Sequence, residues 1–241
     1  MLFHHKINLK SIIPDGFMDI HSHVLPGIDD GAKTLDESVS MIKRFQELGI
    51  NKIVTTPHIM GGVWPNSKVE ILNKLSGLKK KLLKEGINNF WVEAAAEYML
   101  DENFIELLEK KDLLTIDGNK LLLEMSYINA PSNLFEIIFD IQVLGFIPVL
   151  AHPERYNYYH LEKSKYNRLL RSGVLFQLNL LSLSRYYGSK VQKTALYLLE
   201  NNMYSFVGTD AHNIKHLKYE NIYLSKKHSS MLEGLLQKNC L

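Results

Sequence analysis

The chain has 241 residues, of which 46% are hydrophobic, and its formal net charge at pH 7 is +2. This length and composition suit one soluble globular domain with a substantial core. The lysines are spread along predicted helices rather than gathered in one basic block, so nothing in the charge indicates a nucleic-acid partner. We therefore expect no binding to nucleic acid.

The only cysteine, Cys240, is the penultimate residue. A single thiol excludes an internal disulfide framework, argues against a cysteine nucleophile and is compatible with a reducing, cytoplasmic setting. No apolar stretch suits a signal peptide, and none approaches the roughly 20 residues of a membrane-spanning helix. We expect a cytoplasmic protein without direct membrane insertion, in which residues 1–16 form an N-terminal arm and residues 17–241 form one domain. The sequence does not indicate an oligomeric state.

Predicted strands and helices alternate along the chain. Short runs rich in Val, Ile, Leu or Phe predict strands near 17–21, 51–56, 91–96, 120–125, 146–150, 173–178 and 204–208. Helical patterns lie near 35–48, 67–86, 101–110, 131–144, 160–171, 190–201 and 228–238. Glycines that suit left-handed helix ends precede several strands, at Gly49, Gly86, Gly145 and Gly173. This alternation predicts an α/β fold with a parallel, closed or nearly closed sheet.

Histidines and carboxylates end several of the predicted strands. His21 and His23 lie two apart on one strand, so their imidazoles point to the same side, and Asp210 and His212 repeat this spacing on the last strand. Such pairs are natural chelates for a first-row divalent ion. Because a parallel barrel gathers the C-terminal ends of its strands on one face, the sequence predicts a multinuclear metal centre for hydrolysis.

Asp30 and His58 are further candidate ligands. Asp29-Asp30-Gly31 also reads as a turn, and Asp30 could serve both purposes, with Gly31 supplying backbone freedom. His58 could instead be a strand-end histidine bonded to the backbone. We favour a ligand because His58 follows a strand at the face where active sites are built.

Glu97, Glu124 and His152 complete the candidate set. A glutamate at the end of a buried strand is costly unless it is paired or bound to metal. Glu93 shares the parity of Glu97, but Glu97 lies closer to the expected mouth of the barrel and suits a bridge between two ions. Arg155 follows His152 in the same loop, where its guanidinium suits phosphate oxygens, although a surface pair with Glu154 is the simpler alternative.

Other residues are less informative. Trp64 follows His58 in a glycine-containing loop and could cover the pocket, contact an aryl ring or pack against the next helix. The tyrosines from Tyr156 to Tyr159 are expected to pack rather than bind substrate. The remaining histidines are expected at the surface: His4, His5, His160, His216 and His228.

These motifs, in this order over residues 17 to 212, resemble the polymerase-and-histidinol-phosphatase (PHP) superfamily. More narrowly, Asp19-Ile20-His21-Ser22-His23, Asp29-Asp30-Gly31 and Ala151-His152-Pro153-Glu154-Arg155-Tyr156 look like bacterial PHP-type protein-tyrosine phosphatases. Those enzymes depend on manganese and are associated with capsular and extracellular polysaccharide synthesis. The resemblance implies a single-domain, distorted (β/α)7 TIM-like barrel.

The resemblance also implies three metal ions, most readily Mn²⁺, with Fe, Mg or Zn as alternatives. The first ion would be bound by His21, His23, Glu97 and Asp210. The second would be bound by Glu97, Glu124 and His152, and the third by Asp30, His58 and His212. Arg155 would hold substrate phosphate, and with Asp30 and His58 it forms the expected catalytic set. One departure is that only Lys215 and Lys218 stand where a further arginine is often found after the Asp-x-His motif.

The expected function is therefore hydrolysis of protein phosphotyrosine by metal-activated water, with a bacterial tyrosine kinase of polysaccharide synthesis as the substrate protein. A small-molecule phosphatase, such as one acting on histidinol phosphate, is the nearest alternative because the ligands alone do not separate the two. A non-catalytic kinase-binding module is a second alternative. Nuclease action has no support from the charge distribution.

Overall fold

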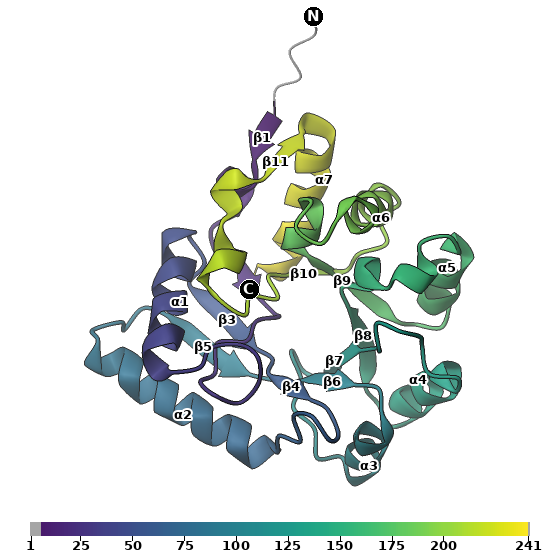
Figure 1. The fold of residues 1–241 in the computed structure, drawn as a ribbon, viewed down its shortest axis with the longest axis horizontal. Coiled ribbons are helices and arrows are strands. Elements are labelled where there is room, and N and C mark those ends of the chain that lie inside the picture. The colour runs from purple at the N-terminus through teal and green to yellow at the C-terminus, as the bar shows by residue number, and fades with distance from the viewer. Residues whose placement is uncertain (1–5, 241) are drawn as a thin grey trace, which may run out of the picture.

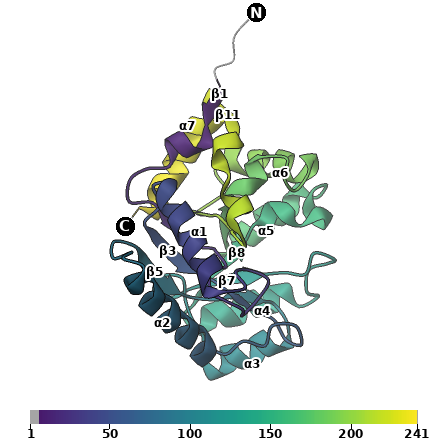
Figure 2. The same cartoon turned by 60° about the vertical axis from the view of Figure 1, so that its left-hand side comes forward.

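The structure is a computed structural model and describes residues 6–240. In this part of the chain, helices lie around a central set of strands (Figure 1; Figure 2). The α-helices are α1 (Leu35–Glu47), α2 (Lys68–Lys84), α3 (Glu102–Lys110), α4 (Leu134–Val143), α5 (Lys163–Arg171), α6 (Ser189–Glu200) and α7 (Lys226–Leu236). All seven predicted helices are confirmed, with ends that differ from the predicted ones by at most a few residues.

Local sequence explains where the helices begin and end. The Ser67 side chain accepts from the Glu70 backbone while the Glu70 carboxylate accepts from the Ser67 backbone, which forms a capping box at the start of α2. Left-handed backbones occur at the four predicted helix-ending glycines: Gly49 (φ 83°), Gly86 (φ 75°), Gly145 (φ 89°) and Gly173 (φ 81°). The predicted helix-to-strand junctions are therefore confirmed.

The strands inside the ring of helices form two parallel sheets. The smaller sheet has the order β2-β3-β5 and contains β2 (Met18–Asp19), β3 (Lys52–Thr55) and β5 (Trp91–Ala94). The larger has the order β10-β9-β8-β7-β6-β4 and contains β4 (His58–Ile59), β6 (Glu97–Met99), β7 (Lys120–Glu124), β8 (Ile147–Ala151), β9 (Leu175–Asn179) and β10 (Phe206–Gly208). Every pairing within the two sheets is parallel, which confirms the α/β prediction.

Two predicted strands, 51–56 and 91–96, are each followed by a further short strand. β3 ends just before Thr56-Pro57, where the proline has no N–H to donate, and Ala95-Ala96 separate β5 from β6. The two further strands lie side by side, because the Glu97 N–H donates to the Pro57 carbonyl over 3.1 Å. Glu97 therefore begins β6, in register with His58 of β4, and the prediction that it ends the strand that starts near Trp91 is wrong.

The first and last strands of the parallel sheets come together at the sheet ends. Ser22 forms an isolated parallel bridge with Ala211. The His23 N–H donates to the Ala211 carbonyl over 2.9 Å, and the Asp210 N–H donates to the His21 carbonyl over 2.7 Å. The sheet is therefore curled, and its curl places His21, His23 and Asp210 next to one another.

Residues 6–12 of the predicted N-terminal arm have a structural role that the sequence did not indicate. β1 (Lys6–Asn8) pairs antiparallel with β11 (Tyr223–Ser225), and Leu9 is completely buried. This segment thus packs onto the C-terminal part of the chain. Residues 1–5 of the arm lie outside the described residues. Across residues 6–240, no helix combines the length and apolarity that crossing a membrane requires.

Candidate metal centre

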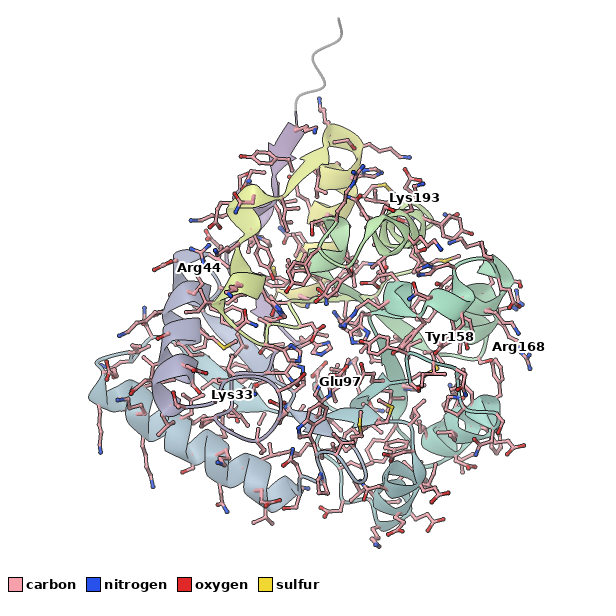
Figure 3. The ribbon with its side chains drawn as sticks, viewed as in Figure 1. Lys33, Arg44, Glu97, Tyr158, Arg168 and Lys193 are labelled. Atoms are coloured by element: carbon pink, nitrogen blue, oxygen red, sulfur yellow. The ribbon has the colours of Figure 1, made fainter. Side chains whose placement is uncertain are left out.

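The nine predicted ligands lie in one cluster at the centre of the ring of elements, where Figure 3 shows Glu97. Their ligand atoms form overlapping groups within 4.8 Å: His21, His23, Glu97 and Asp210; His23, Asp30, His58 and His212; and His58, Glu97 and Glu124. His152 joins through its Nε2, which lies 3.1 Å from Glu97 Oε1 and 3.6 Å from Glu124 Oε1. Residues from positions 21 to 212 therefore meet in one place.

The histidine tautomers in the cluster leave lone pairs facing inward. His21 Nδ1 lies 2.8 Å from Gln177 Oε1, and His23 Nδ1 lies 2.8 Å from Asp29 Oδ2. Because both oxygens only accept hydrogen bonds, each Nδ1 carries a proton, and in the neutral ring each Nε2 is an unprotonated acceptor. The two Nε2 atoms lie 3.3 Å apart. Two unprotonated nitrogens cannot hydrogen-bond to each other, so a cation that both could bind explains their closeness.

Buried carboxylates surround the same point. Glu97 Oε2 lies 3.1 Å from His21 Nε2 and 3.2 Å from His58 Nδ1, and Asp210 Oδ1 lies 3.4 Å from His21 Nε2. Burial and then the negative charge of Glu97 raise the pKa of Glu124 to about 8. Carboxyl groups that resist ionising side by side, next to imidazole lone pairs, suit divalent ions, whose charge would offset the repulsion.

Two of the nine residues have backbones that L-residues rarely adopt. His152 (φ 32°) and Asp210 (φ 51°) are both in the left-handed region. Such conformations cost about 1–3 kcal/mol each and gather at functional sites. The Nδ1 of His152 is also buried without a hydrogen-bond partner among the described residues. The ligand role of His152 rests on its other ring nitrogen, Nε2, which faces Glu97 and Glu124.

Two glycines make room for the histidine pair. A Cβ on Gly31 would lie 2.2 Å from the His23 carbonyl oxygen, and a Cβ on Gly208 would lie 2.6 Å from His21 Cβ. Gly31 has no positive φ, so the predicted reason for this glycine, backbone freedom, is wrong. It is needed because the chain passes too close to His23 for any side chain.

The cluster reaches the surface at Asp30, whose side chain is 50% exposed. Asp30 Oδ1 lies 3.3 Å from His212 Nε2 and 3.6 Å from His58 Nε2. Because both His58 nitrogens face carboxylates, the alternative of a ring bonded only to backbone does not describe it. The Trp64 ring stacks on His58, with centroids 4.9 Å apart and an interplanar angle of 13°, and so lies beside this opening.

Arg155 faces the cluster. Its Nη1 lies 2.6 Å from Asp210 Oδ2, and its guanidinium carbon lies 4.9 Å from the centre of the Tyr127 ring and 4.4 Å from that of Tyr187. The alternative pair with Glu154 does not form. The buried Glu154 carboxylate accepts instead from the Asn179 N–H over 3.0 Å and from the Tyr204 hydroxyl over 2.9 Å. A guanidinium held in this way can bind phosphate oxygens next to the cluster.

The residues that orient the proposed ligands were not identified from the sequence. Gln177 and Asp29 orient His21 and His23, and Asn179 Nδ2 donates to Asp210 Oδ2 over 2.8 Å. Thr209 donates through both its N–H and its hydroxyl to Asp19 over 2.7 Å, which fixes the backbone before Asp210. Gln177 and Asn179 are polar and share parity on the otherwise apolar β9, a signal that was available in the sequence.

Glu93 and Tyr156, which were not chosen as ligands from the sequence, do not contribute to the cluster. Glu93 pairs with Lys79 over 2.6 Å, away from the cluster. Tyr156 is buried and its hydroxyl accepts from the Met125 N–H over 3.0 Å, so it packs as predicted. Of the histidines expected at the surface, those that the structure describes are only partly exposed. His160, His216 and His228 are half-buried, and His216 Nδ1 lies 3.4 Å from the Asp210 carbonyl oxygen. His4 and His5 lie outside the described residues, and Lys215 and Lys218 are exposed.

Comparison with known proteins gives relatives that cover most of the chain. The chain is similar to tyrosine-protein phosphatase YwqE of Bacillus subtilis (strain 168), with 33% identity over 227 residues that span 92% of this chain and 89% of the relative. It is similar to tyrosine-protein phosphatase CpsB of Streptococcus agalactiae, with 30% identity over 203 residues, 82% of this chain and 83% of the relative.

A solved structure is also similar. It is described as one of "YwqE from Bacillus subtilis and CpsB from Streptococcus pneumoniae, unique metal-dependent tyrosine phosphatases", and it matches with a TM-score of 0.78 and 32% identity over 92% of this chain and 86% of that chain. Residues 17–234 match the protein family described as "Capsular polysaccharide synthesis, CpsB/CapC". The chain therefore belongs to the CpsB/CapC family of capsular polysaccharide synthesis.

Proposed function

We propose that this protein is a metal-dependent protein-tyrosine phosphatase that acts at the cluster of nine side chains. The observation that carries the proposal is the convergence of buried imidazole and carboxylate ligands beside Arg155. Relatives at 30–33% identity over most of the chain are named tyrosine-protein phosphatases, which supports the same activity here.

The ligand geometry supports three divalent ions, with Mn²⁺ the first choice and Fe, Mg or Zn as alternatives. The first would be held by His21, His23, Glu97 and Asp210, the second by Glu97, Glu124 and His152, and the third by Asp30, His58 and His212. His58 also lies close to the second group and His23 to the third. Bound ions would supply a nucleophile at neutral pH by lowering the pKa of water from 15.7 to about 7.

The protein's own residues would position and stabilise the substrate. Arg155 presents its guanidinium to phosphoryl oxygens, whose negative charge it offsets. Asp30 and His58 lie at the exposed end of the cluster, where a phosphate on a protein surface can enter. The leaving phenolate has an unperturbed pKa near 10, so it needs less help from an acid than an aliphatic alkoxide does. We assign no general acid.

The type of barrel, the protein substrate and the cellular location are also part of the proposal. The further short strands and the Ser22–Ala211 bridge support a distorted (β/α)7 TIM-like barrel over residues 17–241. The family supports a bacterial tyrosine kinase of polysaccharide synthesis as the phosphotyrosyl protein. The cytoplasmic location stays a prediction of the sequence.

Turnover with a matched pair of variants tests the function. Hydrolysis of a phosphotyrosyl peptide, histidinol phosphate and p-nitrophenyl phosphate is measured with Mn²⁺ and with a chelator, for the native protein, Asp30→Asn and Asp36→Asn. Asp36 is an exposed aspartate at the start of α1 and serves as the control. We expect metal-dependent peptide hydrolysis that Asp30→Asn lowers by about 100-fold, or about 2.7 kcal/mol, while Asp36→Asn has no effect.

Two results would contradict the proposal. Faster hydrolysis of histidinol phosphate than of the peptide would identify a small-molecule phosphatase. No turnover of any phosphoester by metal-loaded protein would favour the non-catalytic binding module.

A further inference from the structure

Basic residues outnumber acidic ones along α5, α6 and the segments beside them. Between residues 155 and 199 the chain has eight lysines and arginines and one carboxylate, Glu162, although its overall charge is only +2. The eight are Arg155, Lys163, Lys165, Arg168, Arg171, Arg185, Lys190 and Lys193. Figure 3 shows Arg168 and Lys193 toward the outer edge on the side of α5 and α6. The lysines are spread along several helices, as expected from the sequence, but residues 155–199 carry an excess of positive charge.

Three of these lysines line one groove of about 720 Å³, which we call the lysine groove. Its walls include Lys163 from α5, Lys190, Lys193 and Tyr197 from α6, and Asn157 and His160 from the segment before α5. Leu161 also lines the groove and is 97% exposed. The groove thus combines cationic ends with apolar and aromatic surface.

The cations of the lysine groove are not neutralised by the protein. Among residues 6–240, no carboxylate forms an ion pair within 4 Å with Lys163, Lys190 or Lys193. The single carboxylate of this stretch, Glu162, pairs instead with Lys165 over 3.6 Å. Lys163 Nζ lies over the Tyr197 ring at 4.5 Å. Burial lowers the pKa of His160, and the charges of Lys163 and Lys190 lower it further, as expected for ammonium groups that converge on one place.

The lysine groove adjoins the catalytic arginine along the chain. Arg155 ends the short helix Pro153–Arg155, and Asn157 of the groove begins the next one, Asn157–Tyr159. The His160 ring lies 2.7 Å from the Glu154 carbonyl oxygen, which ties the groove wall to the residue before Arg155. The groove wall and Arg155 therefore belong to one short stretch of chain.

We propose that the lysine groove binds acidic side chains that flank the phosphotyrosine of the protein substrate. This inference rests on the proposed phosphatase function. Opposite charge favours encounter and the correct orientation of a substrate more than it favours tight binding. The groove is concave, its lysines have no carboxylate partner, and its wall follows Arg155 in the chain, which suits an acidic segment of the substrate better than a broad anionic membrane surface or a nucleic-acid duplex.

Peptide kinetics with charge-matched variants test the lysine groove. Two phosphotyrosyl peptides are compared, one flanked by glutamates and one by glutamines, together with p-nitrophenyl phosphate. The variant Lys163→Gln/Lys190→Gln/Lys193→Gln is set against Lys74→Gln/Lys80→Gln/Lys84→Gln, which removes the same charge from exposed positions of α2 on another side of the molecule. Circular dichroism of both variants checks that they fold.

We expect the native enzyme to prefer the glutamate-flanked peptide through a lower KM, and to lose this preference as salt is raised. The groove variant should raise KM for that peptide by about five-fold, a change typical of partly exposed charge pairs, with kcat unchanged. Its p-nitrophenyl phosphate turnover, and all rates of the α2 variant, should match the native enzyme.

Other outcomes separate this inference from the function on which it rests. If native protein fails to hydrolyse p-nitrophenyl phosphate, the proposed function fails. If it does hydrolyse that substrate but shows no preference for acidic flanks, or if the two triple variants behave alike, the groove assignment is overturned. Binding of anionic phosphatidylglycerol vesicles or a DNA oligonucleotide that only the groove variant loses, without a peptide preference, would assign the surface to those partners instead.

Discussion

At the scale of single residues, the cluster depends on side chains that do not themselves face its centre. Gln177 Oε1 lies 2.8 Å from His21 Nδ1 and 3.3 Å from the His152 backbone nitrogen, so one amide oxygen serves two of the proposed ligands. An acceptor at Nδ1 fixes both the tautomer and the ring orientation of His21. We therefore propose Gln177 as a positioning residue for the proposed metal centre.

Replacing Gln177 tests this role. Gln177→Ala should weaken Mn²⁺ binding by about 10- to 100-fold, as loss of an outer partner of a metal ligand does. Isothermal titration calorimetry on protein freed of metal measures the change. Gln46→Ala, which removes an exposed amide bonded to Asn89, is the control. Equal Mn²⁺ affinity in Gln177→Ala and native protein would exclude the positioning role.

The sequence predicted the chemistry of individual residues better than their support. Histidines and carboxylates at strand ends could be identified because apolar strands make them stand out. Gln177 and His21 lie 156 positions apart, and no local pattern links them. Asp29 was visible within its motif, yet only the structure shows that it accepts from the His23 imidazole.

At the scale of elements, β10 lies against the His21 segment so closely that Gly208 has no room for a side chain. A Cβ there would lie 2.6 Å from His21 Cβ and 2.8 Å from Gln177 Nε2. In α7, by contrast, a Cβ on Gly234 would meet nothing within 4 Å. The two glycines therefore make a matched pair for testing how β10 positions the cluster.

Replacing each of these two glycines with alanine should change the stability of the protein in opposite directions. Gly208→Ala should lower the free energy of unfolding by about 1–3 kcal/mol through overpacking, and weaken Mn²⁺ binding as well. Gly234→Ala should raise it by up to about 1 kcal/mol because alanine favours a helix. Urea denaturation followed by circular dichroism measures both. A Gly208→Ala protein as stable as the native one would show that this contact is not tight.

The order of elements could be predicted from sequence, but the details of strand pairing could not. Alternating apolar runs and glycine-ended helices identify each strand and helix in turn. The breaks after Thr55 and after Ala94 depend on how neighbouring strands bend together. The β1–β11 pair joins segments more than 200 residues apart, and neither carries a strong strand pattern.

At the scale of the whole molecule, the proposed ligands come from strands of the larger parallel sheet and from loops that follow strands of both sheets. Ions that bind only the folded state stabilise it by mass action. Because the cluster joins segments from His21 to His212, metal binding should stabilise the entire domain rather than one loop.

Thermal unfolding tests this coupling. At a Mn²⁺ concentration 100 times the Kd, one binding event adds about 2.7 kcal/mol, which corresponds to a rise in Tm of about 5–10 °C for a domain of this size. Chelator should reverse the rise, and Asp210→Asn should reduce it. Differential scanning calorimetry that shows the same Tm with Mn²⁺ and with chelator would contradict a metal centre built into the fold.

The most direct test is a manganese anomalous difference map from crystals grown with Mn²⁺ and phosphate. We predict three peaks among the nine side chains, at ligand distances of about 2.0–2.3 Å, with a phosphate held between the metals and Arg155. A map without any peak in contact with His21, His23, Glu97 or Asp210 would contradict the proposed centre and the phosphatase mechanism built on it.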